Sequence, residues 1–268
     1  MIFIEENIYD FDELKMYFGE DYWVTDKICI KVPTIGDILE FGDTKFYTIL
    51  KLFCANTTSL RLKLWKNGID WNKISDFELF SNFLVKNFTP NDTKLLFGNL
   101  DFSKFNYIYD SEKDCNLLVY FPINKTELPT QYNEDETIVI DELVYKKIVK
   151  YICVMFDLHF KVEFAKNKAT KEAMIWEEEM NFETNKENKN RQKSFLLPLI
   201  SSMVNHPGFK YKLNELKEVG IFQFMDSVKR LQTYESVTAL MKGMYSGFID
   251  TSKINVQKEL NWLKDLNE

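Results

Sequence analysis

The chain has 268 residues, of which 45% are hydrophobic and 15% aromatic, enough to build a packed core in one large domain or two modest ones. This composition argues against global disorder. The formal net charge of -7 argues against a protein whose main task is to neutralise a phosphate backbone, so we expect no direct binding of nucleic acid.

The cysteines give no sign of a disulfide framework or a thiolate metal site. Cys29, Cys54, Cys115 and Cys153 are far apart and form no C-x-x-C pair, so we expect a reduced cytosolic protein with free thiols. The N-terminus lacks the basic region of a signal peptide, and no apolar stretch approaches the roughly 20 residues that span a bilayer. We therefore expect no membrane association.

Residues 1–103 predict a mainly helical region. After an aromatic, acidic start, residues 27–32 (KICIKV) form a short β-like run. Pro33 and Thr34 can open a helix over 35–41, since proline is tolerated in a first turn. Gly42 then ends that helix, and Asp43 or Thr44 can cap a second one through about Phe53.

A further helix is predicted to begin after Ser75. Glu78 stands three residues later, which is the spacing of a capping box. The helix has a broad apolar face made of Phe77, Leu79, Phe80, Phe83, Leu84 and Phe88. Residues 89–102 then predict a turn and a short helix that Gly98 ends.

Residues 104–140 predict a small β layer. The runs at 104–110 (KFNYIYD) and 116–123 (NLLVYFPI) are rich in tyrosine and branched residues, and 111–115 (SEKDC) separates them. Residues 136–140 (ETIVI) can add a third short strand. The acidic stretch before them, 123–136, reads as a loop.

Helix returns over residues 141–268. Asp141 is a plausible cap for the first helix of this region, and a long, polar-rich helix follows from about residue 169. This second helix carries one narrow apolar stripe at positions i, i+4, i+7 and i+11: Ala169, Ala173, Trp176 and Met180. Residues 181–193 have almost no apolar side chains. They are either the fraying end of this helix or a linker, and we favour the helix end.

Residues 193–247 combine several local signals. An apolar run is punctuated by Pro198 and closed by a Pro-Gly pair at 207–208. Residues 221–232 then have helical spacing, which predicts a helix buried on the face of Phe222, Met225 and Val228. Further on, Gly243 and Gly247 break the helical pattern.

No motif with catalytic chemistry is present. The two histidines, His159 and His206, lie in no H-E-x-x-H or Glu-x-x-His pattern, and no phosphate-binding glycine loop or G-x-S-x-G elbow occurs. The glutamates at 172, 177–179 and 183 read better as a solvated helix face than as a cation site. The basic cluster at 186–193 reads better as a solvated helix end. We expect a non-enzyme with no catalytic residue, no metal and no cofactor.

Four aromatic residues are candidates for a protein interface. Tyr22, Trp23, Trp65 and Trp71 stand near turn-like sequence, where large aromatic side chains can anchor a partner. The alternative, which we favour for a chain this rich in aromatic residues, is that they pack in the core.

Six segments of the chain, in this order, resemble a family of proteins encoded among the tail genes of tailed bacteriophages of Gram-positive hosts. The resemblance runs from about Val32 to Trp262. The segments are 32–49 (VPTIGDILEFGDTKFYTI), 74–80 (ISDFELF), 93–105 (TKLLFGNLDFSKF), 167–179 (NKATKEAMIWEEE), 193–205 (KSFLLPLISSMVN) and 221–232 (IFQFMDSVKRLQ).

The resemblance implies a tail assembly chaperone or a component associated with the baseplate or hub. Its partners would be other tail proteins, with the tape-measure protein or a baseplate hub protein first among them, and self-association stays open. It would act in the host cytoplasm during assembly, and either leave or remain in the virion tail. The family offers no catalytic residues to transfer. Two alternatives stay open: a nucleic-acid-modifying or phosphoryl enzyme with an unrecognised carboxylate site, and a regulatory module directed at a host protein.

The predicted fold is therefore mainly α with a small β-hairpin layer, an α+β arrangement resembling a helical bundle. We expect a helical N-terminal region (1–103), a β-hairpin insertion (104–140) and a helical C-terminal region (141–268), joined in one compact unit.

Overall fold

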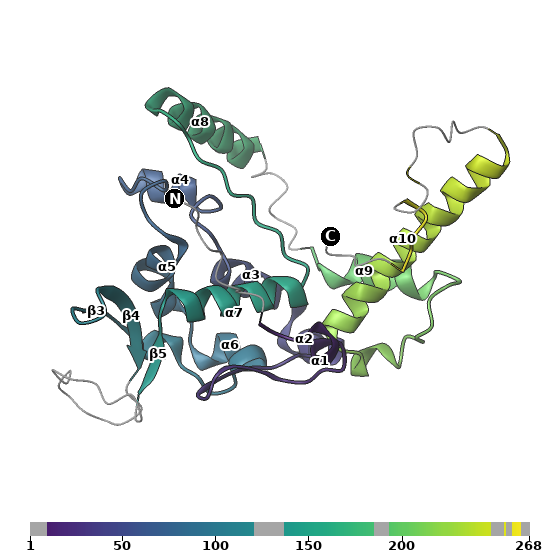
Figure 1. The fold of residues 1–268 in the computed structure, drawn as a ribbon, viewed down its shortest axis with the longest axis horizontal. Coiled ribbons are helices and arrows are strands. Elements are labelled where there is room, and N and C mark those ends of the chain that lie inside the picture. The colour runs from purple at the N-terminus through teal and green to yellow at the C-terminus, as the bar shows by residue number, and fades with distance from the viewer. Residues whose placement is uncertain (1–9, 121–136, 185–192, 248–254, 256–258, 264–268) are drawn as a thin grey trace.

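The computed structural model describes residues 10–120, 137–184, 193–247, 255 and 259–263. Within these residues the protein is mainly helical and carries two small antiparallel sheets, which confirms the predicted α+β class (Figure 1). The loop predicted at 123–136 lies outside the described residues. Of the polar stretch 181–193, residues 181–184 are helical, as favoured, and most of the rest lies outside the described residues.

The first two predicted helices form, although the N-cap of the second is Gly42 and not the predicted Asp43 or Thr44. α2 (Ile35–Phe41) opens with a capping box, in which the Thr34 hydroxyl accepts a hydrogen bond from the Asp37 N–H at 3.1 Å and the Asp37 carboxylate accepts one from the Thr34 N–H at 2.8 Å. Gly42 ends the helix with φ = +96°, a conformation that costs a residue with a Cβ atom. α3 (Asp43–Phe53) follows directly.

The helix predicted after Ser75 begins with the expected capping box but changes its winding twice. It comprises α5 (Asp76–Leu79), a π-helical turn (Phe80–Leu84) and a 3₁₀ turn (Val85–Asn87). Phe83, which the sequence places on the apolar face, is 47% exposed, because the wider π turn shifts the angular position of its residues away from α-helical spacing. α6 (Pro90–Phe97) then ends as predicted at Gly98, where φ is +60°.

Two sheets are present among the described residues. β1 (Tyr22–Thr25) pairs with β2 (Ile28–Ile30), so the predicted run at 27–32 is one arm of a hairpin. The second sheet has the order β3-β4-β5, with strand bounds Asn106–Asp110, Cys115–Tyr120 and Ile138–Ile140. Both pairings in it are antiparallel, and this confirms the predicted hairpin with a third strand.

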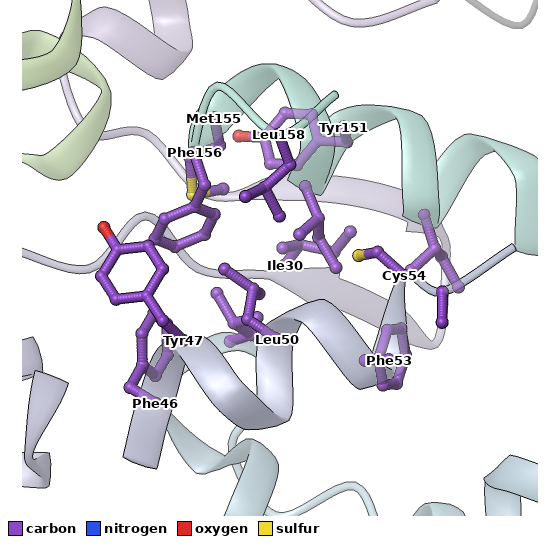
Figure 2. Close-up of a cluster of buried hydrophobic side chains, with 14 of the residues drawn as sticks. Ile30, Phe46, Tyr47, Leu50, Phe53, Cys54, Tyr151, Met155, Phe156 and Leu158 are labelled. Atoms are coloured by element: carbon purple, nitrogen blue, oxygen red, sulfur yellow. The ribbon is translucent and has the colours of Figure 1, made fainter. Parts of the chain in front are cut away.

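The core lies between α3 and α7 (Glu142–Met155), which Asp141 caps as predicted. Figure 2 shows side chains that meet there, with Leu50 and Tyr47 of α3 near Met155 and Phe156 at the C-terminal end of α7. Phe53 is the centre of an aromatic cluster, and ring centroids 5.0–5.4 Å away belong to Phe80, Phe88, Phe97 and Phe102. The N-terminal helices and α7 therefore share one core.

Short elements join these parts, and the sequence pattern did not predict most of them. They are α1 (Glu13–Tyr17), α4 (Arg61–Lys66) and the 3₁₀ turns Phe102–Lys104 and Leu216–Glu218. After α7 an extended segment, residues 158–167, leads to α8 (Lys168–Thr184), and α9 (Leu196–Val204) follows later in the chain.

The last long helix, α10 (Ile221–Tyr245), confirms the helix predicted at 221–232 and corrects its details. Its buried residues are Ile221, Phe224, Met225, Val228 and Val237, whereas Phe222 is only half-buried. Met225 and Val228 of the predicted face are thus buried, and Ile221 and Phe224 take the place of Phe222 in it. Gly243 lies inside the helix rather than breaking it, and Gly247 follows its end with φ = +75°.

α10 is joined to the N-terminal helices by backbone contact at its start. The Ile35 N–H donates to the Val219 carbonyl at 2.9 Å, and the Ile221 N–H donates to the Pro33 carbonyl at 3.0 Å. Gly36 allows this approach, because a Cβ atom there would lie 2.7 Å from the Lys217 carbonyl oxygen.

Candidate protein-interaction surface

α8 is a peripheral helix with very little buried surface. Of its 17 residues only Ile175 is buried, and the helix packs against α4 at one edge of the molecule (Figure 1). A helix in this position normally turns its apolar stripe toward the protein and its polar face toward water. α8 buries Ile175 and half-buries Met174 on its inward side, but it leaves its apolar stripe exposed.

The inward face of α8 is held by charged side chains. The Arg61 guanidinium of α4 is largely buried and forms ion pairs with Glu178 of α8 and with Glu163 of the extended segment. Burial alone would lower the pKa of Arg61, but its hydrogen bonds to the two carboxylates outweigh that effect and raise it. Arg61 therefore stays charged and joins three segments of the chain.

A second ion pair holds the first turn of α8. The Lys171 ammonium pairs with the Asp70 carboxylate, and this hydrogen bond lowers the pKa of Asp70. The same ammonium lies 5.8 Å from the centre of the Trp71 ring, in cation–π contact. Farther along the helix Glu179 pairs with Lys66 at 3.1 Å in a more exposed setting.

The extended segment before α8 is fixed by side chains from two loops. The Asn56 amide donates to the Lys161 carbonyl at 2.8 Å, and the Asn72 amide donates to the Ala165 carbonyl at 2.7 Å. Between them the Glu163 N–H donates to the Thr58 hydroxyl at 3.1 Å. These bonds set where α8 begins, so its position is determined from both ends of the segment.

The outward face of α8 carries the apolar stripe that the sequence shows. Ala169, Ala173, Trp176 and Met180 are all exposed, with Trp176 at 65% and Met180 at 47%. Large apolar side chains that are held rigidly on an exposed surface are a common sign of a protein–protein contact. We define these four residues as the α8 stripe.

The four aromatic candidates from the sequence do not form one surface. Tyr22 is half-buried, its ring stacks on Tyr151 with centroids 4.5 Å apart, and its hydroxyl donates to Asp10. Burial raises the pKa of Tyr22. Trp23, the next residue of β1, is 62% exposed and is accessible to a partner.

Trp65 and Trp71 lie beneath α8 rather than on the outer surface. Trp71 is 1% exposed, and Trp65 is half-buried on α4 with its ring centroid 5.9 Å from that of Trp71 in an edge-on contact. Together they form part of the platform on which α8 rests, as the core interpretation of these residues expects.

Comparison with known families gives one match. Residues 186–267 match the family model described as the YomV second domain. No curated protein and no solved structure matches the chain. YomV is a phage-associated protein, so the match supports a phage association for this chain as well.

The match covers less than half of the chain and lies in its C-terminal part. It includes α9 and α10 and begins just after the end of α8. α8 and its platform therefore stand outside the matched region.

Other chemistry is sparse in the part of the chain that the structure describes. No group of three or more His, Cys, Asp or Glu side chains is placed there to hold a metal ion. No described helix is both long enough and apolar enough to cross a membrane. His159 is exposed and contacts Asp157 at 2.8 Å, and Asp157 also pairs with Lys229 of α10 at 2.6 Å.

The residues that orient α8 were missed at the sequence level. Arg61 and Glu178 are separated by 117 positions, and Asn56 and Lys161 by 105. No local pattern pairs residues so far apart. The stripe itself was visible in the spacing, but its direction was not.

Proposed function

We propose that this chain is a non-enzymatic protein of phage tail assembly, a tail assembly chaperone or a component associated with the baseplate or hub, that acts by binding other proteins. The α8 stripe is the single observation that carries the proposal. A helix that anchors itself through ion pairs and presents tryptophan and methionine to water is suited to contact a second protein.

The way α8 is held strengthens this proposal. Its ion pairs with Arg61 and Asp70 and the bonded segment before it keep the helix in place before any partner arrives. A preformed surface loses less conformational entropy on binding than a flexible one. α8 therefore has the properties of a binding element.

Two further observations support a phage setting for this proposed binding. The match to a domain of phage-associated YomV supports the general setting. The resemblance of about Val32 to Trp262 to proteins of phage tail gene clusters supports the more specific role in tail assembly. It also suggests a tape-measure or baseplate hub protein as partner. The protein would then work in the host cytoplasm while tails are built.

A null mutant of the phage gene tests this role. Without the protein, infected cells should still fill heads with DNA but should accumulate unattached heads and few complete tails, because head and tail assembly join late. Electron microscopy of lysates measures this, with complementation in trans as the control. Normal tailed particles at normal yield would rule out the assembly role.

The same experiment distinguishes the two alternatives. A block in DNA replication would point to a nucleic-acid-modifying or phosphoryl enzyme. Expression early in infection, apart from the tail genes, would point to a regulator of a host protein.

A further inference from the structure

The charges around the α8 stripe are mostly negative. At about 100° of rotation per residue, Ala169, Ala173, Trp176 and Met180 share an arc with Glu172 and Glu183 that is roughly 100° wide. Glu177 flanks this arc on one side. Lys168 flanks it on the other side and contacts Glu172 at 3.8 Å, so the border of the stripe holds three carboxylates and one ammonium group.

These bordering carboxylates have little compensation within the described residues. Glu177 and Glu183 form no ion pair with any residue that the structure describes, and Glu172 meets only Lys168, at 3.8 Å. On the inward face the carboxylate of Glu178 is paired with the buried Arg61. The contrast between the two faces indicates that the outer carboxylates are available to an external cation.

We propose that the α8 stripe binds a basic amphipathic helix of a partner protein, and this rests on the proposed function. The partner helix would have apolar residues at i, i+3 or i+4, and i+7, flanked by lysine or arginine. Its apolar side chains would pack on Trp176 and Met180 and come close to the helix backbone at Ala169 and Ala173. Its cations would pair with Glu172, Glu177 and Glu183.

A second copy of this chain fits the surface less well. Pairing two α8 helices would place the carboxylates of one copy against those of the other, and like charges in contact oppose association. A basic amphipathic helix can cover the apolar stripe and, at the same time, pair its cations with the carboxylates beside the stripe. Electrostatic complementarity therefore selects the occupant among helices of similar apolar content.

A synthetic peptide tests the proposal. The probe is a labelled amphipathic helix of about 18 residues, roughly five turns, with leucine on one face and lysine on its flanks. A second peptide carries glutamate in place of each lysine, and a third has the composition of the first in scrambled order. Fluorescence anisotropy with the full chain should show the basic helix binding at least about tenfold more tightly than either control.

Variants of the full chain identify the surface. Trp176→Ala with Met180→Ala should weaken binding of the basic peptide by about tenfold or more, whereas Trp23→Ala, at an exposed tryptophan elsewhere, should not change it. Glu172→Lys with Glu183→Lys should reverse the preference, so that the acidic peptide binds more tightly. Circular dichroism and thermal melting check that each variant is folded.

Four results would overturn the inference. Equal binding of the scrambled peptide would show that only general charge attraction acts. Equal binding of the acidic peptide, or no binding of any peptide, would remove the charge argument. A dimer in analytical ultracentrifugation that Trp176→Ala and Met180→Ala disrupt would identify a second copy as the occupant. The last result would leave α8 as a binding surface, and hence the proposed function, intact.

Discussion

At the scale of single residues, Arg61 does most to determine where α8 lies. Replacing it with methionine keeps much of its volume but leaves Glu163 and Glu178 without their cation. We expect a loss of about 1–3 kcal/mol in the free energy of unfolding, moderated because both carboxylates are partly exposed. Urea unfolding measures it, and hydrogen exchange should show faster exchange in α8.

Lys66→Met is the matched control for this prediction. Lys66 also pairs with a glutamate of α8, but both partners are well exposed, so the loss should be below about 1 kcal/mol. Equal effects of the two variants would contradict the anchoring role of Arg61.

The ion pair between Asp70 and Lys171 makes the stability of the protein depend on pH. Lys171 lowers the pKa of the folded Asp70 carboxyl below its usual value of 3.8. The pair therefore stabilises the protein above pH 3.8, and this stabilisation is lost as the pH falls below 3.8 through the lower pKa of the folded state. Asp70→Asn should therefore lower the stability at pH 6 and flatten its decline toward pH 3. Denaturant titrations at several pH values measure both, and an unchanged slope would show that the pair contributes nothing.

At the scale of elements, α10 depends on its buried face. Met225 is buried and Gln232 of the same helix is exposed. Met225→Asp should cost several kcal/mol, because a carboxylate would be buried without a partner, while Gln232→Asp should change the stability by less than about 1 kcal/mol. Thermal melting of the two variants compares them, and similar melting temperatures would refute the core assignment.

The junction between α2 and the segment before α10 depends on Gly36. Gly36→Ala would bring a methyl group to 2.7 Å from the Lys217 carbonyl oxygen, so the backbone must shift, at a cost of about 1–3 kcal/mol. At Gly220 a Cβ atom would meet only Val32, at 4.0 Å, and φ is -60°, so Gly220→Ala should cost less than about 1 kcal/mol. If both variants were equally stable, the close approach would not constrain the fold.

Elements whose start and end signals are local were predicted from the sequence. Thr34, Ser75 and Asp141 cap helices, and Gly42 and Gly98 end them, because each of these signals acts within four residues. The π turn at Phe80–Leu84 was not predicted, since its packing against Phe53 and Tyr145 comes from other parts of the chain.

The candidate surface was predicted less well than the fold. Aromatic type and nearby turns selected Trp65 and Trp71, but their packing under α8 depends on contacts that no local pattern reports. The α8 stripe was visible as spacing alone. Its outward direction follows from Arg61 and Asp70, each more than 100 residues from its partner in α8.

At the scale of the whole molecule, the core and the proposed binding surface lie in different parts of the chain. The core between α3 and α7 holds the body together, and α8 and α10 project from it in different places (Figure 1). The region matching the YomV second domain includes α10, whereas the α8 stripe lies before it. We therefore expect that changes in the α8 stripe can abolish the proposed binding while the rest of the chain stays folded.

Complementation of the null phage with an α8 variant tests this account most directly. Cells that supply the chain with Trp176→Ser and Met180→Ser should contain the variant at normal level but should produce few complete tails and many unattached filled heads. Cells that supply Trp23→Ser, a change at an exposed tryptophan of β1, should restore tailed particles. Tailed particles counted by electron microscopy at the normal yield with the α8 variant would contradict the claim that this helix is the binding surface.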